Sequence, residues 1–83
     1  MQLIDKHIAF IAYIINALAN KHHISPFAIY RKLTQVNCIE KYLIPHYDTL
    51  HTLGEEYLTD DIEQYLKNRG VVIWLFITVL FKK

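Results

Sequence analysis

The sequence has few of the residues on which elaborate chemistry and tight turns depend. Its single cysteine, Cys38, excludes an internal disulfide framework and any metal site built from several cysteines. Two glycines and two prolines among 83 residues leave little turn chemistry for a multi-stranded β-sandwich or barrel. The length also leaves no room for a catalytic domain beside a second module. We therefore expect one small domain with a single modest core.

An excess of charge of either sign is also absent. Nine basic and eight acidic residues give a net charge of +1, and the only arginines are Arg31 and Arg69. A nucleic-acid-binding protein usually carries a basic face that neutralises several phosphates, and Arg31-Lys32 is the nearest approach to one. The composition therefore disfavours a nucleic-acid partner. The start MQLIDKHIAF has no secretory leader pattern, so we expect a cytoplasmic location.

No apolar run reaches membrane-spanning length. The longest runs are residues 8–19 and 71–81, whereas a spanning helix needs about 20 apolar residues. With 53% hydrophobic and 20% charged residues, the chain is expected to be globular. An alternative is association with a membrane surface through residues 71–83.

The apolar spacing predicts helices throughout the first part of the chain. In residues 3–21, isoleucines and leucines recur in steps of three and four, in a stripe wide enough to need more than one covering neighbour. Ser25-Pro26 is typical of a helix start, and Asn37 is a plausible left-handed stop for a helix over residues 26–36. A third helical stretch spans residues 38–53, where Pro45 predicts a kink or a break, with a kink favoured because the apolar spacing continues.

The remaining segments complete an all-α prediction. Residues 55–59 are expected to form a connector, followed by a helix capped at Thr59 or Asp60 and stopped by Gly70. Together these elements predict an all-α fold, a small bundle of four to five helices in which the third helix is kinked at Pro45. Residues 1–70 form the expected single helical domain. Residues 71–83 form an apolar C-terminal extension, expected to be helical and packed on the domain or on a partner.

No motif for catalysis, cofactor binding or metal binding is found. The five histidines include no pair spaced three or four apart on a helix, as zinc sites on helices require. There is no glycine-rich phosphate loop and no nucleophile elbow. Cys38 is interpreted as a small buried residue, and the carboxylates near residue 60 as helix caps. We therefore expect a protein that is not an enzyme, with no cofactor, no metal and no catalytic residues.

Aromatic residues are the most informative feature. Six tyrosines lie mostly on or beside the predicted apolar faces, where a ring can pack while its hydroxyl finds a polar partner. One interpretation is a polar-edged core. A second interpretation is a recognition surface, and the candidate partner-binding residues are Tyr47, His51, Tyr57 and Asp61 in the domain, with Trp74 and Phe76 in the extension.

A helix-turn-helix DNA-binding regulator is also considered, because residues 25–53 contain two helices joined by a short turn. The second helix would begin at Ile39 and carry Glu40 and Lys41 at its start. It lacks arginine and has an acid where a phosphate would bind, so it is a poor recognition helix.

Residues 24–70 resemble the bacterial domain-of-unknown-function family 3791. The resemblance depends on a tyrosine, a Leu-His-Thr sequence, a glycine and an Asp-Ile pair. These residues are Tyr47, Leu50, His51, Thr52, Gly54, Asp61 and Ile62.

The resemblance implies a role rather than an activity. Members of the family are often encoded beside a protein that looks like an ADP-ribosyltransferase, which suggests a toxin–antitoxin-like pair. We therefore expect a small non-catalytic interaction module, the antitoxin-like partner of such a neighbour. A homo-oligomer is the alternative protein partner.

Overall fold

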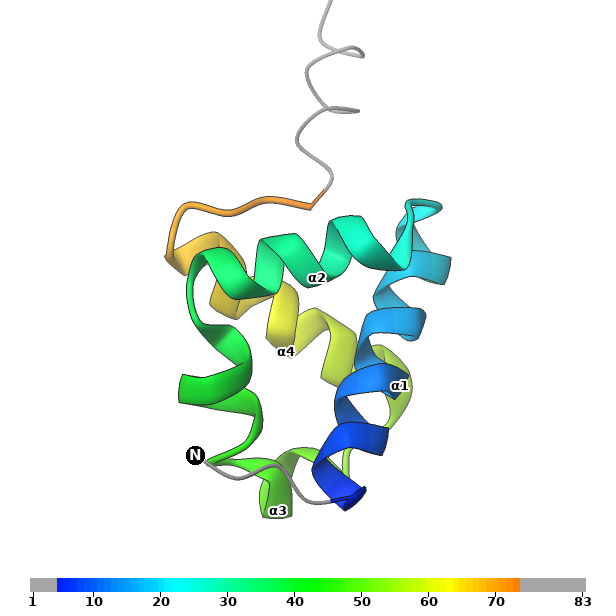
Figure 1. Ribbon diagram of the computed structural model, residues 1–83, viewed down its shortest axis with the longest axis vertical. Helices are drawn as coiled ribbons and strands as arrows, with labels where there is room; N and C mark the ends of the chain where they lie inside the picture. Colours follow the sequence, from blue (N-terminus) through cyan, green and yellow to red (C-terminus); the bar gives the residue numbers. More distant parts are fainter. Residues whose placement is uncertain (1–4, 74–83) are drawn as a thin grey trace, which may run out of the picture.

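The computed structural model describes residues 5–73, and all of its regular elements in that range are helical. The elements are α1 (Asp5–His22), α2 (Pro26–Gln35), the π-helical segment η1 (Ile39–Leu43), the short α3 (Tyr47–Leu50) and α4 (Glu55–Asn68). Figure 1 shows α1, α2 and η1 arranged around α4. The expected small all-α bundle is confirmed. The expected C-terminal helix, including Trp74 and Phe76, lies outside the described residues.

Helix α1 supplies one side of the core. Phe10, Ile14 and Leu18 are buried and follow one another at intervals of four, so they lie on one face of the helix. The helix ends where His23 adopts a left-handed conformation with φ of 57°. The N–H of Ile24 then donates to the carbonyl of Ala19 across 3.1 Å, which satisfies one of the free carbonyls at the helix end.

Helix α2 begins and ends as its sequence predicts. The Ser25 hydroxyl accepts a 3.1 Å hydrogen bond from the N–H of Ala28, and Pro26 occupies the first helical position, where no N–H is needed. At the other end Asn37 has φ of 55°, the left-handed conformation expected of it.

Pro45 interrupts the third helical stretch. Before it, the N–H of Ile44 donates to the carbonyl of Ile39, five residues back, which is the π-helical pattern of η1. After it, α3 contains only four residues. Because proline has no N–H to donate, the stretch forms two short segments joined by a turn over residues 44–46 rather than one ladder of hydrogen bonds.

Helix α4 begins earlier than predicted. The structure starts it at Glu55, with an extended Gly54 at the cap position, so the expected connector over residues 55–59 is wrong. Leu58, Ile62 and Leu66 are all buried at intervals of four, and the burial of Leu58 requires the helix to include that first turn. Asp60 and Asp61 are consequently interior residues of α4 rather than caps.

The end of α4 directs the chain back onto the bundle. Gly70 has φ of 85°, and its N–H donates to the carbonyl of Lys67 while the N–H of Val71 donates to that of Leu66. These two bonds form the Schellman motif, in which a left-handed residue reverses the chain after a helix. Ile73 then returns to the core, where its side chain is 8% exposed.

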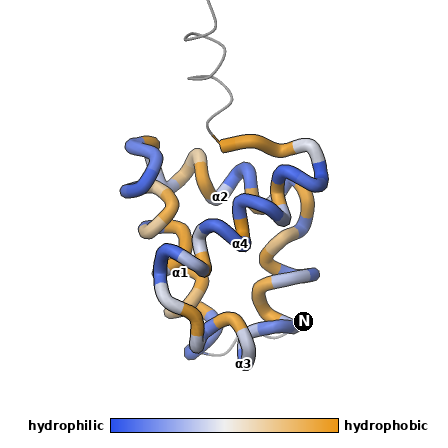
Figure 2. Tube along the Cα trace, turned by 180° about the vertical axis from the view of Figure 1, so that it is seen from behind, coloured by the Kyte–Doolittle hydropathy of each residue, from blue (hydrophilic) through white to orange (hydrophobic). Residues whose placement is uncertain are grey.

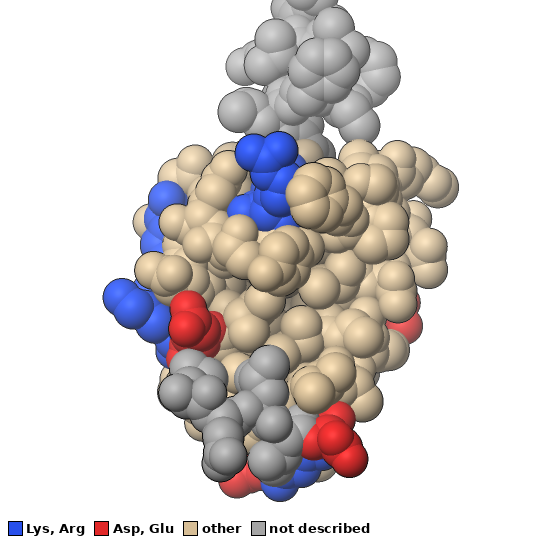
Figure 3. Space-filling model, in the orientation of Figure 1, with Lys and Arg blue, Asp and Glu red and all other residues tan. Residues whose placement is uncertain are grey.

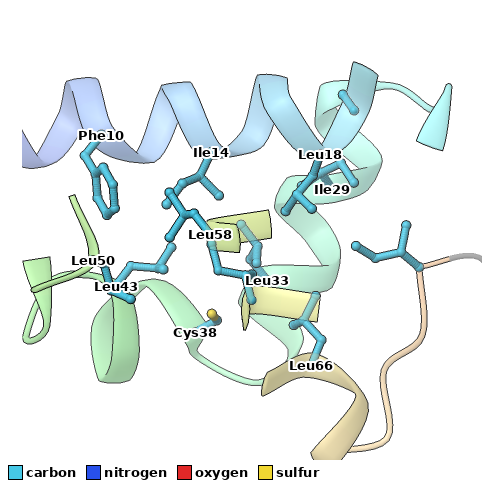
Figure 4. Packing of buried hydrophobic residues seen from close by; sticks show 13 residues of the cluster. Phe10, Ile14, Leu18, Ile29, Leu33, Cys38, Leu43, Leu50, Leu58 and Leu66 are labelled. Atoms are coloured by element: carbon cyan, nitrogen blue, oxygen red, sulfur yellow. The ribbon is translucent and has the colours of Figure 1, made fainter. Parts of the chain in front are cut away.

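One apolar cluster holds the bundle together. Figure 4 shows Phe10, Ile14 and Leu18 pointing from α1 toward side chains of the other elements. The cluster consists of Phe10, Ile14, Leu18, Ala19, Ile29, Leu33, Cys38, Leu43, Leu50, Leu58, Ile62, Leu66 and Ile73. Hydrophilic and hydrophobic positions alternate along α4, as Figure 2 shows from the opposite side. Within residues 5–73, no helix has both the length and the apolar character needed to span a membrane.

Candidate functional site

An apolar hollow lies where α1, α2 and η1 meet. Its volume is about 330 Å³ and none of its lining side chains is charged. The lining residues are Ile8, Ile11, Ala12, Ile15, Tyr30 and Ile39. Figure 3 shows the face on which α1, α2 and η1 lie in front, with the charged side chains placed mainly around its margin. We name this feature the α1–α2 hollow.

Helix α1 builds one wall of the hollow from a second apolar stripe. Ile8, Ile11 and Ile15 recur in steps of three and four, beside the buried stripe that begins at Phe10. Ala12 between them has a small side chain, which leaves a depression in the wall. The Ile8 side chain is 50% exposed, so this stripe is only partly covered by the described residues.

Helix α2 adds aromatic side chains to the same surface. Tyr30 lines the hollow and is 46% exposed, and Phe27, one turn earlier on α2, is 66% exposed. Residues three apart on a helix are neighbours, so the two rings extend the apolar surface along α2. The guanidinium carbon of Arg31 lies 5.9 Å from the centre of the Phe27 ring and marks the charged edge of this surface.

Tyr47 and His51, two of the residues predicted to bind a partner, lie together. Their rings stack with centroids 4.5 Å apart and an angle of 6° between planes, as their spacing of four allows. The Tyr47 ring also meets Phe10 of α1 edge-on at 5.2 Å, and the Lys6 ammonium lies 5.1 Å from its centre. Tyr47 thus anchors α3 to α1. The exposed His51 side chain lines a second hollow, together with Tyr47.

Asp61 and Tyr57 belong to other surroundings. Asp61 accepts a short hydrogen bond from the hydroxyl of Tyr42, whose ring stacks on Tyr65 with centroids 4.4 Å apart. Tyr57 is 69% exposed on the first turns of α4. Among residues 5–73, no hydrogen bond or ring contact joins Asp61 or Tyr57 to the Tyr47–His51 pair. The predicted domain residues therefore do not form one connected group. Trp74 and Phe76 lie outside the described residues.

Two protonated groups pack into this bundle. Burial, together with the hydrogen bond to Asp61, raises the pKa of Tyr42 to about 12. Burial raises the pKa of the Cys38 thiol to about 12 as well. Cys38 is fully buried, so at neutral pH it is a protonated, inaccessible thiol rather than a nucleophile.

A polar seam joins α1 to α4. The Lys21 ammonium lies 2.7 Å from a carboxylate oxygen of Asp60 and 2.7 Å from one of Glu63. Burial lowers the pKa of Lys21, but the hydrogen bonds to the two carboxylates outweigh burial and raise it above its ordinary value. His22 Nε2 lies 3.1 Å from the same Glu63 oxygen. Among residues 5–73, no three histidine, cysteine or acidic side chains are grouped closely enough to hold a metal ion.

None of the residues that line the α1–α2 hollow was among the partner-binding residues predicted from the sequence. The apolar spacing assigns Ile8, Ile11 and Ile15 to a core stripe, and Tyr30 is one aromatic residue among several. The sequence feature that could have indicated the hollow is the unusual width of the apolar stripe on α1. A narrower stripe would be enough to form the core, so part of this one is left to line another surface. Which stripe remains uncovered depends on where α2 and η1 pack.

Comparison with known proteins adds a family to this geometry. A family model described as "Protein of unknown function (DUF3791)" matches residues 9–69, which include most of α1 and the whole of α2, η1, α3 and α4. No curated protein and no solved structure matches the chain.

Proposed function

We propose that this chain, which belongs to the family of proteins of unknown function DUF3791, is a small non-catalytic module that binds a protein partner through the α1–α2 hollow. The proposal keeps the cytoplasmic location expected from the sequence. Helices α1 and α2 hold the apolar side chains of the hollow in place. The free energy of binding would come from removing these side chains from water when the partner covers them.

The observation that carries the proposal is the continuous apolar surface of the hollow. Scattered exposed apolar side chains are normal in soluble proteins, whereas contiguous ones mark interaction sites. Here Ile8, Tyr30 and Phe27 are each about half exposed or more and come from two packed helices. A concave apolar surface formed between helices suits the apolar face of an amphipathic helix. The favoured partner is therefore a protein that presents such a helix.

The proposed partner is an ADP-ribosyltransferase-like protein encoded beside the gene. Support for its identity comes from the family resemblance, in which such neighbours are common, and support for the mode of binding comes from the hollow. The chain would act as the antitoxin-like component and restrain its partner by occupying part of the partner's surface. A second copy of this chain is the alternative occupant.

Co-purification of the chain with its encoded neighbour, followed by calorimetric titration of the two purified proteins, tests the proposal. We expect association at micromolar concentration or tighter. Ile8→Lys or Tyr30→Lys should weaken it by roughly 30-fold, because charging a central contact costs about 2 kcal/mol. Both residues are half exposed, so the fold should tolerate either change, which circular dichroism verifies.

Asn16→Lys is the matched control, since Asn16 is an exposed residue of α1 that does not line the hollow. It adds the same charge to the same helix and should leave the affinity within about twofold. Absence of any association between the two wild-type proteins at micromolar concentration would refute the partner. Equal weakening by all three substitutions would refute the hollow as the binding surface.

Neither DNA recognition nor membrane-surface association gains support from the described residues. A helix-turn-helix protein needs a recognition helix after α2, but η1 has five residues and Pro45 follows it closely. Association with a membrane surface depends on residues 71–83, of which the structure describes only the first three.

A further inference from the structure

We propose that the second hollow, between α1 and α3, is a separate binding site that takes an acidic segment of a protein partner. Its volume is about 460 Å³. Lys6, Phe10 and Tyr13 of α1 line it, as do Tyr47 of α3 and His51 directly after α3. We name it the α1–α3 hollow. The inference depends neither on the α1–α2 hollow nor on the encoded neighbour.

The aromatic walls of the α1–α3 hollow are held in place by contacts within the chain. Figure 1 shows α3 beside the N-terminal half of α1. The Tyr47 ring meets Phe10 edge-on with centroids 5.2 Å apart and stacks on His51 with centroids 4.5 Å apart. The Tyr13 hydroxyl donates to the Glu55 carboxylate of α4 across 3.2 Å, while Tyr13 stays 43% exposed. Walls that are already ordered lose little conformational freedom when a ligand covers them.

Lys6 carries the only charge in the described lining of the hollow. Its ammonium lies 5.1 Å from the centre of the Tyr47 ring. Every ion pair within residues 5–73 involves Lys21 or His22, so no carboxylate of that range neutralises Lys6. The exposed His51 adds an imidazole that can donate a hydrogen bond. A carboxylate brought by a partner would supply the missing charge and accept hydrogen bonds from both groups.

The acidic residues around the hollow favour a carboxylate over a phosphate group. Asp5 and Asp48 each adjoin a lining residue in the sequence, and Glu55 accepts the hydrogen bond from Tyr13. None of these three acids lines the hollow itself. A phosphate monoester carries about two negative charges at neutral pH, which a single ammonium does not balance beside three acids. One carboxylate matches one ammonium.

The aromatic rings add a second requirement on the ligand. Phe10, Tyr13 and Tyr47 offer apolar surface beside the Lys6 ammonium, so the ligand needs an apolar side chain close to its carboxylate. The volume of about 460 Å³ lies within the range of small-ligand pockets, so there is room for both groups. An aspartate or glutamate beside a leucine or phenylalanine in a partner's segment meets both requirements.

Nuclear magnetic resonance of the full-length chain, labelled with nitrogen-15, tests the site. The probe is a capped peptide of sequence Leu-Asp-Phe-Asp-Leu, and its control peptide has asparagine in place of both aspartates. We expect the aspartate peptide to shift the amide signals around Lys6, Tyr47 and His51, with a dissociation constant on the order of millimolar. The asparagine peptide should bind roughly threefold to fivefold more weakly, because it forms no ion pair with the ammonium.

Substitutions of exposed lysines assign this difference to the hollow. Lys6→Gln removes the charge and should reduce binding of the aspartate peptide to that of the asparagine peptide, whereas Lys6→Arg should retain it. Lys41→Gln is the matched control, since Lys41 is exposed on η1 and does not line the hollow. It should leave the affinity within about twofold. Circular dichroism verifies that each variant is folded.

Several results would overturn the proposal. Absence of any shift at millimolar peptide, equal binding of the two peptides, or full binding by Lys6→Gln would refute recognition of a carboxylate. Shifts confined to signals around Ile8 and Tyr30 would place the peptide in the α1–α2 hollow instead. Tighter binding of inorganic phosphate at the same signals would make this a phosphate site. Signals of the α1–α3 hollow that change on dilution of the chain alone would assign the hollow to a second copy.

Discussion

The two ends of helix α1 contact their surroundings in opposite ways. At its C-terminal end, Lys21 and His22 meet the Glu63 carboxylate of α4, so the charged groups are paired within the chain. In its N-terminal half, Ile8 lines a hollow and stays half exposed. The charged side chains at the C-terminal end of α1 therefore have partners within the described residues. The N-terminal half instead presents an apolar surface to the solvent.

This difference separates stability from binding. The paired charges at the seam fix how α1 crosses α4, and removing one partner leaves the others without compensation. An apolar side chain that is already half in water contributes little to folding, and its remaining surface is available for association. Substitutions at the core and the seam should therefore affect folding, while substitutions in the hollow should affect binding.

The largest expected contrast is between two isoleucines on α1. Ile14 is fully buried, so Ile14→Ala should lower the free energy of unfolding by about 2–5 kcal/mol. Ile8 is half exposed, so Ile8→Ala should lower it by about 1 kcal/mol or less. Urea unfolding followed by circular dichroism measures both. Should Ile14→Ala fail to fold, Ile14→Val provides a milder test, and equal losses at the two positions would contradict the contrast.

Alkaline pH should also destabilise the folded chain. Tyr42 and Cys38 have pKa values near 12 in the folded chain, above their ordinary values of 10.0 and 9.0, so the folded state holds both protons more tightly. Their contribution is fully present below about pH 9 and is lost as the pH rises toward 12. The expected loss by pH 11 is on the order of 3 kcal/mol.

Urea unfolding at a series of pH values measures this loss, and two variants assign it. Tyr42→Phe and Cys38→Ala should each make the decline between pH 9 and pH 11 shallower, because each removes one of the two groups. An unchanged slope in both variants would show that other groups cause the alkaline loss. Lys21→Met is a useful reference. Burial lowers the pKa of Lys21, but the hydrogen bonds to Asp60 and Glu63 outweigh burial and raise it, so the stabilising charge of Lys21 is also lost only at high pH.

The smallest expected effect on folding is at the seam. Glu63→Gln removes the carboxylate shared by Lys21 and His22 and should cost about 1 kcal/mol, since the seam is partly exposed and partly screened. Raising the salt concentration should reduce the difference from wild type. Glu40→Gln, at an exposed position on η1, is the control and should be nearly neutral. A Glu63→Gln variant as stable as wild type would show that the seam is incidental.

Most of the helical pattern could be predicted because its cues are local. Ser25 caps α2, Asn37 adopts the left-handed conformation and Gly70 ends α4, each through contacts within a few residues. The start of α4 could not be predicted in this way. The sequence Asp60-Asp61-Ile62-Glu63 has the spacing of a capping box, but burial of Leu58 against other elements extends the helix back to Glu55.

Contacts of the candidate functional site could be predicted only where the residues that form them are close in sequence. The Tyr47–His51 stack follows from a spacing of four on one segment. The bond from Tyr42 to Asp61 joins residues 19 apart, and no local pattern predicts it. The α1–α2 hollow is assembled from three elements, so its existence depends on how they pack.

The sequence by itself determined that this chain is an all-α bundle of the DUF3791 family, because helix periods and caps depend on local geometry. It also determined that the chain contains more apolar residues than one core requires, concentrated in α1 and after Gly70. Only the tertiary structure decided which of those residues are buried. Packing of the other helices covers the stripe that begins at Phe10 and leaves Ile8 half exposed. A side chain is removed from water here by neighbours that lie far from it in the sequence.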